Sequence, residues 1–329
     1  MIKIFVGMIF FITGLLLFVA FEISAILQSF DLRGVFVTNA LILSIVLLLV
    51  QLFISNKKIV NVFASSFIFI FIFNLVNVYN HQIVMMPLEG IVDTYRKNNV
   101  IEAAEQYSFA NNTLYYQNQT DEFINQIEEE ILWVTNICSD VFGVNTIPGV
   151  EIILFDDIEL FQLFSFDDSL NGLYRSDQKT IYVLTAGEND RTIKTTLSHE
   201  YVHHYFYSLL GSQNIDVTQF PLWFHEGMAT YISNINNSDV EYESYGDLSL
   251  KDLYYPKDWR QEMQGDNNPY RIAYVAVETL VELEGIEIFP RIVEEVKSGT
   301  DIYTAIEKLT DMPFGEFETI LQDKSGYER

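Results

Sequence analysis

The sequence predicts an α+β protein in which three transmembrane helices precede a domain made of a small mixed sheet and a helical C-terminal half. Three observations predict this fold class. The first 85 residues hold three long apolar runs and almost no charge. Short β-rich runs then alternate with helical patterns up to about residue 185, and only helical patterns follow.

The apolar runs cover residues 4–21, 35–54 and 59–78. Each has about 18 to 20 residues, which is enough for a helix to cross about 30 Å of hydrocarbon. The first run has no small-residue cleavage site of the kind that ends a signal peptide, so we expect it to be retained. Residues 1–82 are therefore expected to form a membrane domain of three transmembrane helices.

Basic residues beside these runs predict the orientation of the membrane domain. Lys3 and the pair Lys57-Lys58 lie on one side, and the loop with Arg33 lies on the other. Loops rich in lysine and arginine stay in the cytoplasm, which places the lysines there. We therefore expect a multi-pass protein of the cell membrane, held in the lipid bilayer, with its C-terminal domain outside the cytoplasm.

The remainder of the chain is strongly acidic. Beyond residue 85 it holds 15 basic and 43 acidic residues, a formal charge of −28. Such a charge repels nucleic acid and anionic headgroups and keeps a domain soluble. We expect no nucleic-acid partner.

Local patterns predict the first elements of the acidic part. A helix over residues 88–109 gives a helical linker at 83–110, followed by a domain over 111–329. In that domain we expect a strand in "NNTLYY" and a helix in "DEFINQIEEEILWVTNICSDVFG" that Thr120 caps. The single cysteine, Cys138, lies on the apolar side of this helix and is expected to be a buried thiol. A strand in "GVEIILFDD" and a hairpin in "GLYRSDQKTIYVLT" follow.

The C-terminal half is expected to be mostly helical. A long helix over residues 191–210 ends at Gly211, and a shorter one covers "LWFHEGMATYIS". A polar loop then reaches about residue 268. The last expected helices cover residues 270–283, 288–297 and 300–309 and the segment "PFGEFETILQ".

The helix expected over residues 191–210 contains "TLSHEYVHH". Because His199 and His203 are four residues apart, both rings leave the same face of the helix and can bind one ion. Zinc fits this pair, since imidazole is a common nitrogen ligand of Zn²⁺. Glu200 lies about 100° around the helix, where it can take a proton from a zinc-activated water without binding the ion.

A catalytic zinc ion needs a third protein ligand and an open fourth position. Glu226 follows His203 after 22 intervening residues and lies on a helix of its own. Its neighbour His225 is an alternative on the same geometric grounds. His204 adjoins His203 but points to a different face of its helix.

The segments "LSHEYVHHYF" and "LWFHEGMATYIS" resemble the gluzincin metallopeptidases, and specifically the family with a peptidase MA-like domain. The order of expected elements matches that family over about residues 112–321. The resemblance implies that His199, His203 and Glu226 bind zinc. It also implies that Glu200 is the general base and acid in the hydrolysis of peptide bonds of a peptide or protein substrate.

The resemblance implies further parts of the site. The strand "KTIYVLT" would edge the cleft and pair with the substrate backbone, and Tyr270 and Tyr274 are candidates to steady the oxyanion. One position departs from the pattern. Thermolysin-like gluzincins have an acid four residues after the glutamate ligand, whereas this chain has Thr230, so the group that orients the first histidine is not assigned.

Two alternatives come from other functional classes. A catalytically inactive, zinc-binding membrane receptor or scaffold would keep the peptidase fold, and loss of Glu200 or a ligand would favour it. An intramembrane protease would place its zinc within the bilayer. The polar segment "GENDRTIK" before the histidine helix argues against the second alternative.

Overall fold

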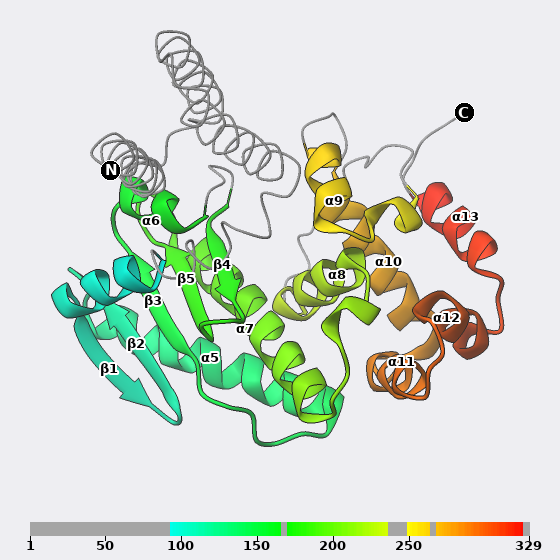
Figure 1. Cartoon of the computed structure of the whole chain (residues 1–329), viewed down its shortest axis with the longest axis horizontal. Helices are drawn as coiled ribbons and strands as arrows, with labels where there is room; N and C mark the ends of the chain where they lie inside the picture. Colours follow the sequence, from blue (N-terminus) through cyan, green and yellow to red (C-terminus); the bar gives the residue numbers. More distant parts are fainter. Residues whose placement is uncertain (1–92, 166–169, 236–248, 264–267, 325–329) are drawn as a thin grey trace, which may run out of the picture. The chain divides into compact units, whose positions relative to one another are not determined.

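The computed structural model describes residues 93–165, 170–235, 249–263 and 268–324 (Figure 1). The three expected membrane spans lie outside these residues, so the anchor and its orientation stay predictions. Within the described ranges, no helix combines the length and the apolar character needed to cross a bilayer. The chain divides into two compact units, and the larger one, made of residues 104–161 and 169–329, carries the five-stranded sheet and the candidate site.

A five-stranded mixed sheet forms the first part of this unit. The three inner strands run parallel, and each edge strand is antiparallel to its neighbour. The α+β class with a small mixed sheet and a helical C-terminal half is therefore confirmed for the described residues. In spatial order the strands are β1 (Glu105–Phe109), β2 (Asn112–Tyr116), β3 (Glu151–Phe155), β5 (Thr180–Leu184) and β4 (Gly172–Arg175).

Strand β1 corrects the prediction of a continuous helix over residues 88–109. Residues 93–103 are helical, but Glu105–Phe109 pairs with β2 across a tight turn at Ala110, whose φ is 49°. Alternation explains the strand: Tyr107 and Phe109 leave the same face, stack with centroids 5.8 Å apart, and Phe109 enters the core. Part of the segment expected to be a helical linker thus belongs to the sheet.

The hairpin "GLYRSDQKTIYVLT" is confirmed, but its first strand, and not its second, lies at the edge of the sheet. Strand β5 was expected at the edge and instead lies inside the sheet, between β3 and β4. Its five residues are all buried, as suits a strand with neighbours on both sides. The edge strand is β4, with Gly172 buried and the next three residues half-buried.

Helix α5 (Asp121–Phe142) begins and ends as predicted. The Thr120 side chain accepts a hydrogen bond from the Phe123 N–H at 3.2 Å, and Gly143 ends the helix in the left-handed conformation, with φ 68°. Cys138 is fully buried, as expected. Burial raises the pKa of its thiol, which leaves a packing role for this side chain.

Helix α7 (Asp190–Ser212) joins the sheet to the helical part (Figure 1). It packs against α5, against β4 and β5, and against the next helix, α8 (Leu222–Ser233). The Asn189 side chain caps it by accepting from the Thr192 N–H at 3.0 Å. The helix continues one residue past Gly211, its expected stop, to Ser212, and Asn214 beyond it adopts φ 57°.

The remaining helices complete the C-terminal half. One of them, α9, lies within the segment expected to be a polar loop and buries Trp259. The other predicted helices are present. The helices of this half are α9 (Pro256–Met263), α10 (Pro269–Glu284), α11 (Ile288–Lys297), α12 (Ile302–Thr310) and α13 (Phe314–Lys324), whereas α6 (Ile158–Ser165) lies between β3 and β4 in the chain.

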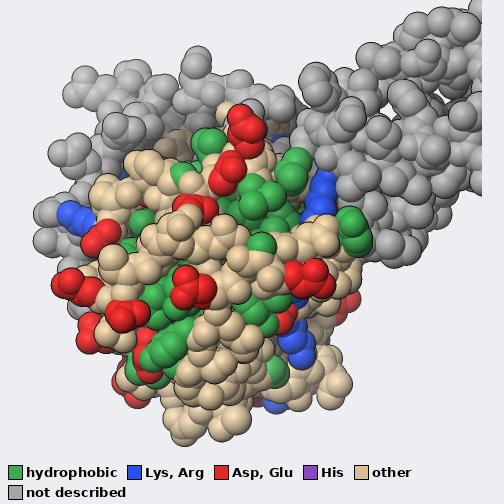
Figure 2. All heavy atoms as spheres, turned by 90° about the vertical axis from the view of Figure 1, so that its left-hand side faces the viewer, with side chains coloured by type: hydrophobic (Ala, Val, Ile, Leu, Met, Phe, Trp, Pro, Cys, Tyr) green, Lys and Arg blue, Asp and Glu red, His purple; other side chains and the backbone are tan. Residues whose placement is uncertain are grey.

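One hydrophobic core runs from the sheet through α5 and α7 into the helical half. Outside it the surface is acidic. Figure 2 shows the face that carries β1 and β2, where acidic side chains are spread around apolar ones and basic side chains are few. This surface agrees with the excess of acidic residues in the sequence.

Helices α8 and α10 pack so closely that only glycine fits at one contact. A Cβ on Gly227 would lie 2.3 Å from the Ala273 backbone oxygen and 2.8 Å from a Val277 methyl group. Gly227 follows Glu226 directly, so this close approach lets α10 support α8 at the residue next to the candidate site.

Replacing this glycine is expected to destabilise the fold. Gly227→Ala must push α8 and α10 apart, which we expect to cost about 1–3 kcal/mol. Gly211→Ala is the matched control, because its Cβ would meet nothing within 4 Å and alanine is the better helix former by roughly 0.5–1 kcal/mol. Chemical denaturation of both variants measures the difference. Equal stabilities would contradict the packing argument.

Candidate metal centre

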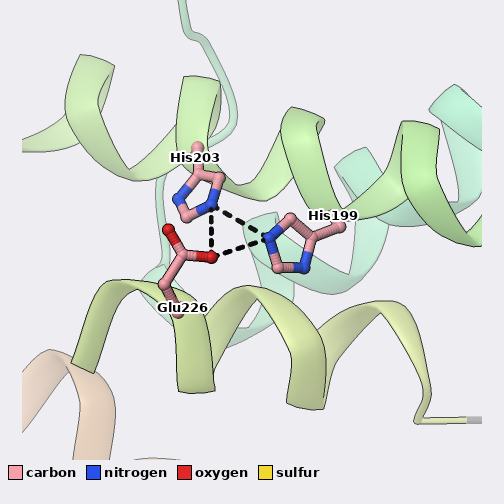
Figure 3. Close-up of side chains that lie close together, drawn as sticks. All are labelled: His199, His203 and Glu226. Carbon is pink, nitrogen blue, oxygen red and sulfur yellow. Dashed lines mark hydrogen bonds and ion pairs between the residues drawn. The ribbon is translucent and has the colours of Figure 1, made fainter. Parts of the chain in front are cut away.

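Two facing helices bring His199, His203 and Glu226 together. Figure 3 shows both rings leaving α7 toward the carboxylate of Glu226 on α8. The Glu226 Oε2 atom lies 3.1 Å from His199 Nε2 and 3.5 Å from His203 Nε2. The two Nε2 atoms are 3.1 Å apart. These three residues form a group that could hold a metal ion.

The spacing of these atoms fits zinc. Tetrahedral zinc with bonds of about 2.0–2.1 Å to nitrogen and oxygen has ligand atoms about 3.3 Å apart. The separations of 3.1, 3.1 and 3.5 Å match that edge length. Two imidazole nitrogens and one carboxylate oxygen are also donors that Zn²⁺ accepts. The side chains of His199, His203 and Glu226 are 17%, 8% and 15% exposed, so solvent can reach the group.

Each of the closely packed groups changes the proton affinity of its neighbours. Burial opposes ionisation of Glu226, but His203 and His199 outweigh it and hold the pKa of the carboxyl well below its ordinary value. Burial likewise favours the neutral ring of His203, yet Glu226 and then Glu200 raise its pKa above 6.5. The protein thus keeps Glu226 ionised and attracts a positive charge to this point, as a cation site requires.

Thr230 supplies the contact that the sequence left unassigned. Its Oγ1 lies 3.4 Å from His199 Nδ1. A histidine that binds metal through Nε2 carries its proton on Nδ1, so this proton points at the Thr230 hydroxyl. The Thr230 hydroxyl can therefore accept this proton and orient the His199 ring. For His203 Nδ1, which is buried, the described residues provide no hydrogen-bond partner.

The other two histidines of this region lie outside the group. His225 Nε2 donates to the Val217 carbonyl at 3.3 Å, and its ring packs on Tyr207 with centroids 5.2 Å apart. His204 Nε2 donates to the Pro148 carbonyl at 2.9 Å. Burial lowers the pKa of both rings to about 4, so both are neutral at neutral pH. Of the two alternatives for a third ligand, the geometry selects Glu226 over His225.

Glu200 follows the first histidine and lies beside the group. Its side chain touches the backbone of β4, since a Cβ on Gly172 would come within 3.0 Å of Glu200 Oε1. The Tyr174 backbone N–H donates to its carboxylate. Burial is the main cause that raises the pKa of Glu200, partly offset by His199 and His203. A carboxylate near a metal group with a raised pKa is suited to accept a proton.

Tyr270 and Tyr274 were predicted from the resemblance as oxyanion-stabilising residues, and they belong to α10. In the described part of the chain, the Tyr270 ring packs on Trp259 and the Tyr274 hydroxyl donates to Glu278 at 2.9 Å. Neither contact involves the metal-binding group, so their catalytic role stays a prediction.

A different tyrosine lies beside the group. Tyr207 is one turn beyond His203 on α7, with ring centroids 6.0 Å apart, and it also packs on Tyr174 at 5.8 Å. Burial and then the charges of Glu226 and Glu200 raise the pKa of its phenol. Tyr207 was not predicted from the sequence, although its spacing of four residues from His203 places both side chains on the same face of α7.

Comparison with known proteins gives one distant relative. No protein-family model matches the chain. The Bacillus subtilis protein YhcO, described as uncharacterized, is 21% identical over 250 residues, which cover 73% of this chain and 77% of YhcO. The description of YhcO gives no activity, so the geometry of the group is what indicates its chemistry.

Removal of any one of the three ligands should abolish tight metal binding. We expect His199→Ala, His203→Ala and Glu226→Ala to weaken zinc binding by at least about a hundredfold, since losing a group that only orients a ligand already costs 10–100-fold. His225→Gln is the control and should keep its zinc. Metal analysis of the purified variants measures this. Retention of zinc by Glu226→Ala would rule out Glu226 as the third ligand.

Zinc affinity should also fall as the pH is lowered. A protonated ring cannot bind metal, and Glu226 raises the pKa of His203 above 6.5. Protons therefore compete with zinc for the His203 ring more strongly as the pH is lowered. Competition with a chelating dye between about pH 5 and 8 follows this change. His225→Gln should leave the profile unchanged, because His225 is already neutral there. A flat profile would contradict the assignment of His203.

Proposed function

We propose that this chain is a zinc-dependent peptidase that hydrolyses peptide bonds with Glu200 as general base. The observation that carries the proposal is the position of Glu200. It lies in the same confined space as three ligands that fit zinc, yet it is held by β4 and is not one of the three. A scaffold that only bound metal would have no need of a fourth, separately held carboxylate.

The roles of the residues follow from their surroundings. When bound, zinc supplies a Lewis acid that lowers the pKa of water to near neutral and polarises a carbonyl oxygen. His199, His203 and Glu226 would hold the ion. Glu200, with its raised pKa, accepts the proton of the attacking water and delivers it to the leaving amine.

Two further observations support a peptidase over other hydrolases. The segments "LSHEYVHHYF" and "LWFHEGMATYIS" resemble those of gluzincin peptidases, and the sheet and helices occur in the order expected from that resemblance. The edge strand β4 lies next to Glu200 and, among the described strands, has a sheet neighbour on one side only. An extended peptide can pair with such an edge through its backbone.

The decisive variant is Glu200→Gln, which keeps the size of the side chain and removes its basicity. We expect peptide cleavage to fall by about two to four orders of magnitude, the range for loss of a positioned general base. Zinc content and thermal stability should stay close to those of the parent. The measurement is cleavage of an unstructured protein, with a chelator as the control for metal dependence.

Two results would count against the proposal. A chelator-sensitive activity that is unchanged in Glu200→Gln would exclude Glu200 as the base. A parent protein that holds a full complement of zinc and cleaves nothing in a broad peptide library would favour the inactive zinc-binding receptor or scaffold.

A further inference from the structure

Glu200 depends on β4 for its position. Thr196, Glu200 and His204 recur every four residues, so they form one stripe along α7. Gly172 and Tyr174 are two residues apart and leave the same face of β4. A Cβ on Gly172 would lie 2.4 Å from Thr196 Cγ2 and 3.0 Å from Glu200 Cγ. The strand therefore lies directly on this stripe, and its backbone touches the base.

Sheet pairing alone does not fix β4 against the helix. As an edge strand, β4 is paired with β5 on one side and has no sheet neighbour on the other among the described strands. Such strands are easily displaced unless side chains hold them. Tyr174 ties β4 to α7 through two ring contacts, with His204 edge to face at 5.4 Å and with Tyr207 at 5.8 Å, and only His204 also accepts a hydrogen bond from its hydroxyl.

The other hydrogen bond of His204 determines which side chain donates in its contact with Tyr174. The His204 Nε2–H donates to the Pro148 carbonyl at 2.9 Å, which places its single ring proton on Nε2. Nδ1 is then an acceptor, and the Tyr174 hydroxyl lies 3.1 Å away. The ring is fully buried. The hydroxyl of Tyr174 must therefore donate.

We propose that His204 and Tyr174 are positioning residues that fasten edge strand β4 to α7 and thereby hold Glu200 beside the metal-binding group. The Tyr174 hydroxyl is hydrogen-bonded to His204 on α7, and the Tyr174 backbone N–H donates to the Glu200 carboxylate. The role of Glu200 in this inference rests on the proposed function. The fastening of β4 does not, and it can be measured separately.

The first measurement is hydrogen exchange of the β4 amides in the full-length protein. Tyr174→Phe removes only the hydroxyl, and His204→Gln keeps a donor for Pro148 while replacing the acceptor. Each should speed exchange in residues 172–175 by about tenfold, and the double variant should add little, since both break the same bond. Tyr205→Phe is the matched control: Tyr205 is a buried tyrosine on the same helix whose hydroxyl donates to the Val144 carbonyl. It should leave β4 unchanged.

The second measurement uses peptide cleavage by the same variants. With Glu200 less well held, Tyr174→Phe and His204→Gln should lower kcat by about tenfold while KM and zinc content stay near the parent values. A residue that only stabilised the fold would lower the melting temperature without this separation, as we expect for Tyr205→Phe.

The outcomes separate the two claims. Faster β4 exchange together with a lower kcat at full zinc content supports the proposal. Unchanged exchange in both variants overturns it, whatever the activity. Faster exchange with an unchanged kcat, in a protein whose Glu200→Gln variant is inactive, overturns the positioning of Glu200. If the parent cleaves nothing, the proposed function falls, and the exchange measurement still decides whether His204 and Tyr174 fasten the strand.

Discussion

The close packing of α7 on α8 is the constraint on which the candidate site depends. His199 and His203 supply two possible metal donors from α7. The third comes from the facing helix α8, with Glu226 Oε2 3.1 Å from His199 Nε2. Helix α8 is held in this place from behind. Gly227, the residue after the glutamate, lets the α10 backbone approach so closely that any side chain there would meet the Ala273 oxygen. Because protein interiors resist compression, a shift of α10 would pass through α8 to the ligand atoms.

The two carboxylates of the site have opposite environments although both lie near the same histidines. Glu226 points between the rings, and their hydrogen bonds and charges lower its pKa despite burial. Glu200 lies to the side, where burial dominates and raises its pKa. Neighbouring titratable groups whose pKa values are shifted in opposite directions commonly have different roles in a site. The permanently ionised Glu226 suits a metal ligand, and the more basic Glu200 suits proton transfer.

The sequence predicted what depends on local patterns and spacing. The caps of α5, the hairpin, and the pairing of His199 with His203 were all correct, because each follows from residues a few positions apart. Glu226 was selected by resemblance and confirmed as a member of the group by geometry. Features that depend on contacts between distant segments were missed. The order of β4 and β5 is set by which strand packs beside β3, and the alternation of Tyr107 and Phe109 was weaker than the helical pattern before it.

The same limit applies around the site. The role of Thr230 could not be assigned because a hydroxyl replaces the expected acid, although it lies at the His199 ring. The family pattern points to Tyr270 and Tyr274, whereas Tyr207 packs on His203, the Tyr274 ring packs on Tyr231 and the Tyr274 hydroxyl donates to Glu278. Which tyrosine approaches a site is decided by how helices cross, and this information is spread over many core side chains.

The polar residues of helix α7 do not lie on one exposed face. It is buried on several sides, and the polar side chains within it are matched to different neighbours. Ser198 donates to Glu130 on α5 at 2.5 Å, Tyr201 meets Thr135 at 2.9 Å, and His204 bonds Pro148. Since a buried polar group without a partner costs about 1–3 kcal/mol, these pairs specify the rotation of α7 about its axis. That rotation directs the rings of His199 and His203 toward α8 and, at the same time, turns Glu200 toward β4. The candidate metal-binding group and the proposed base are therefore set by one helix orientation, which hydrogen bonds to α5 and to the Pro148 carbonyl fix.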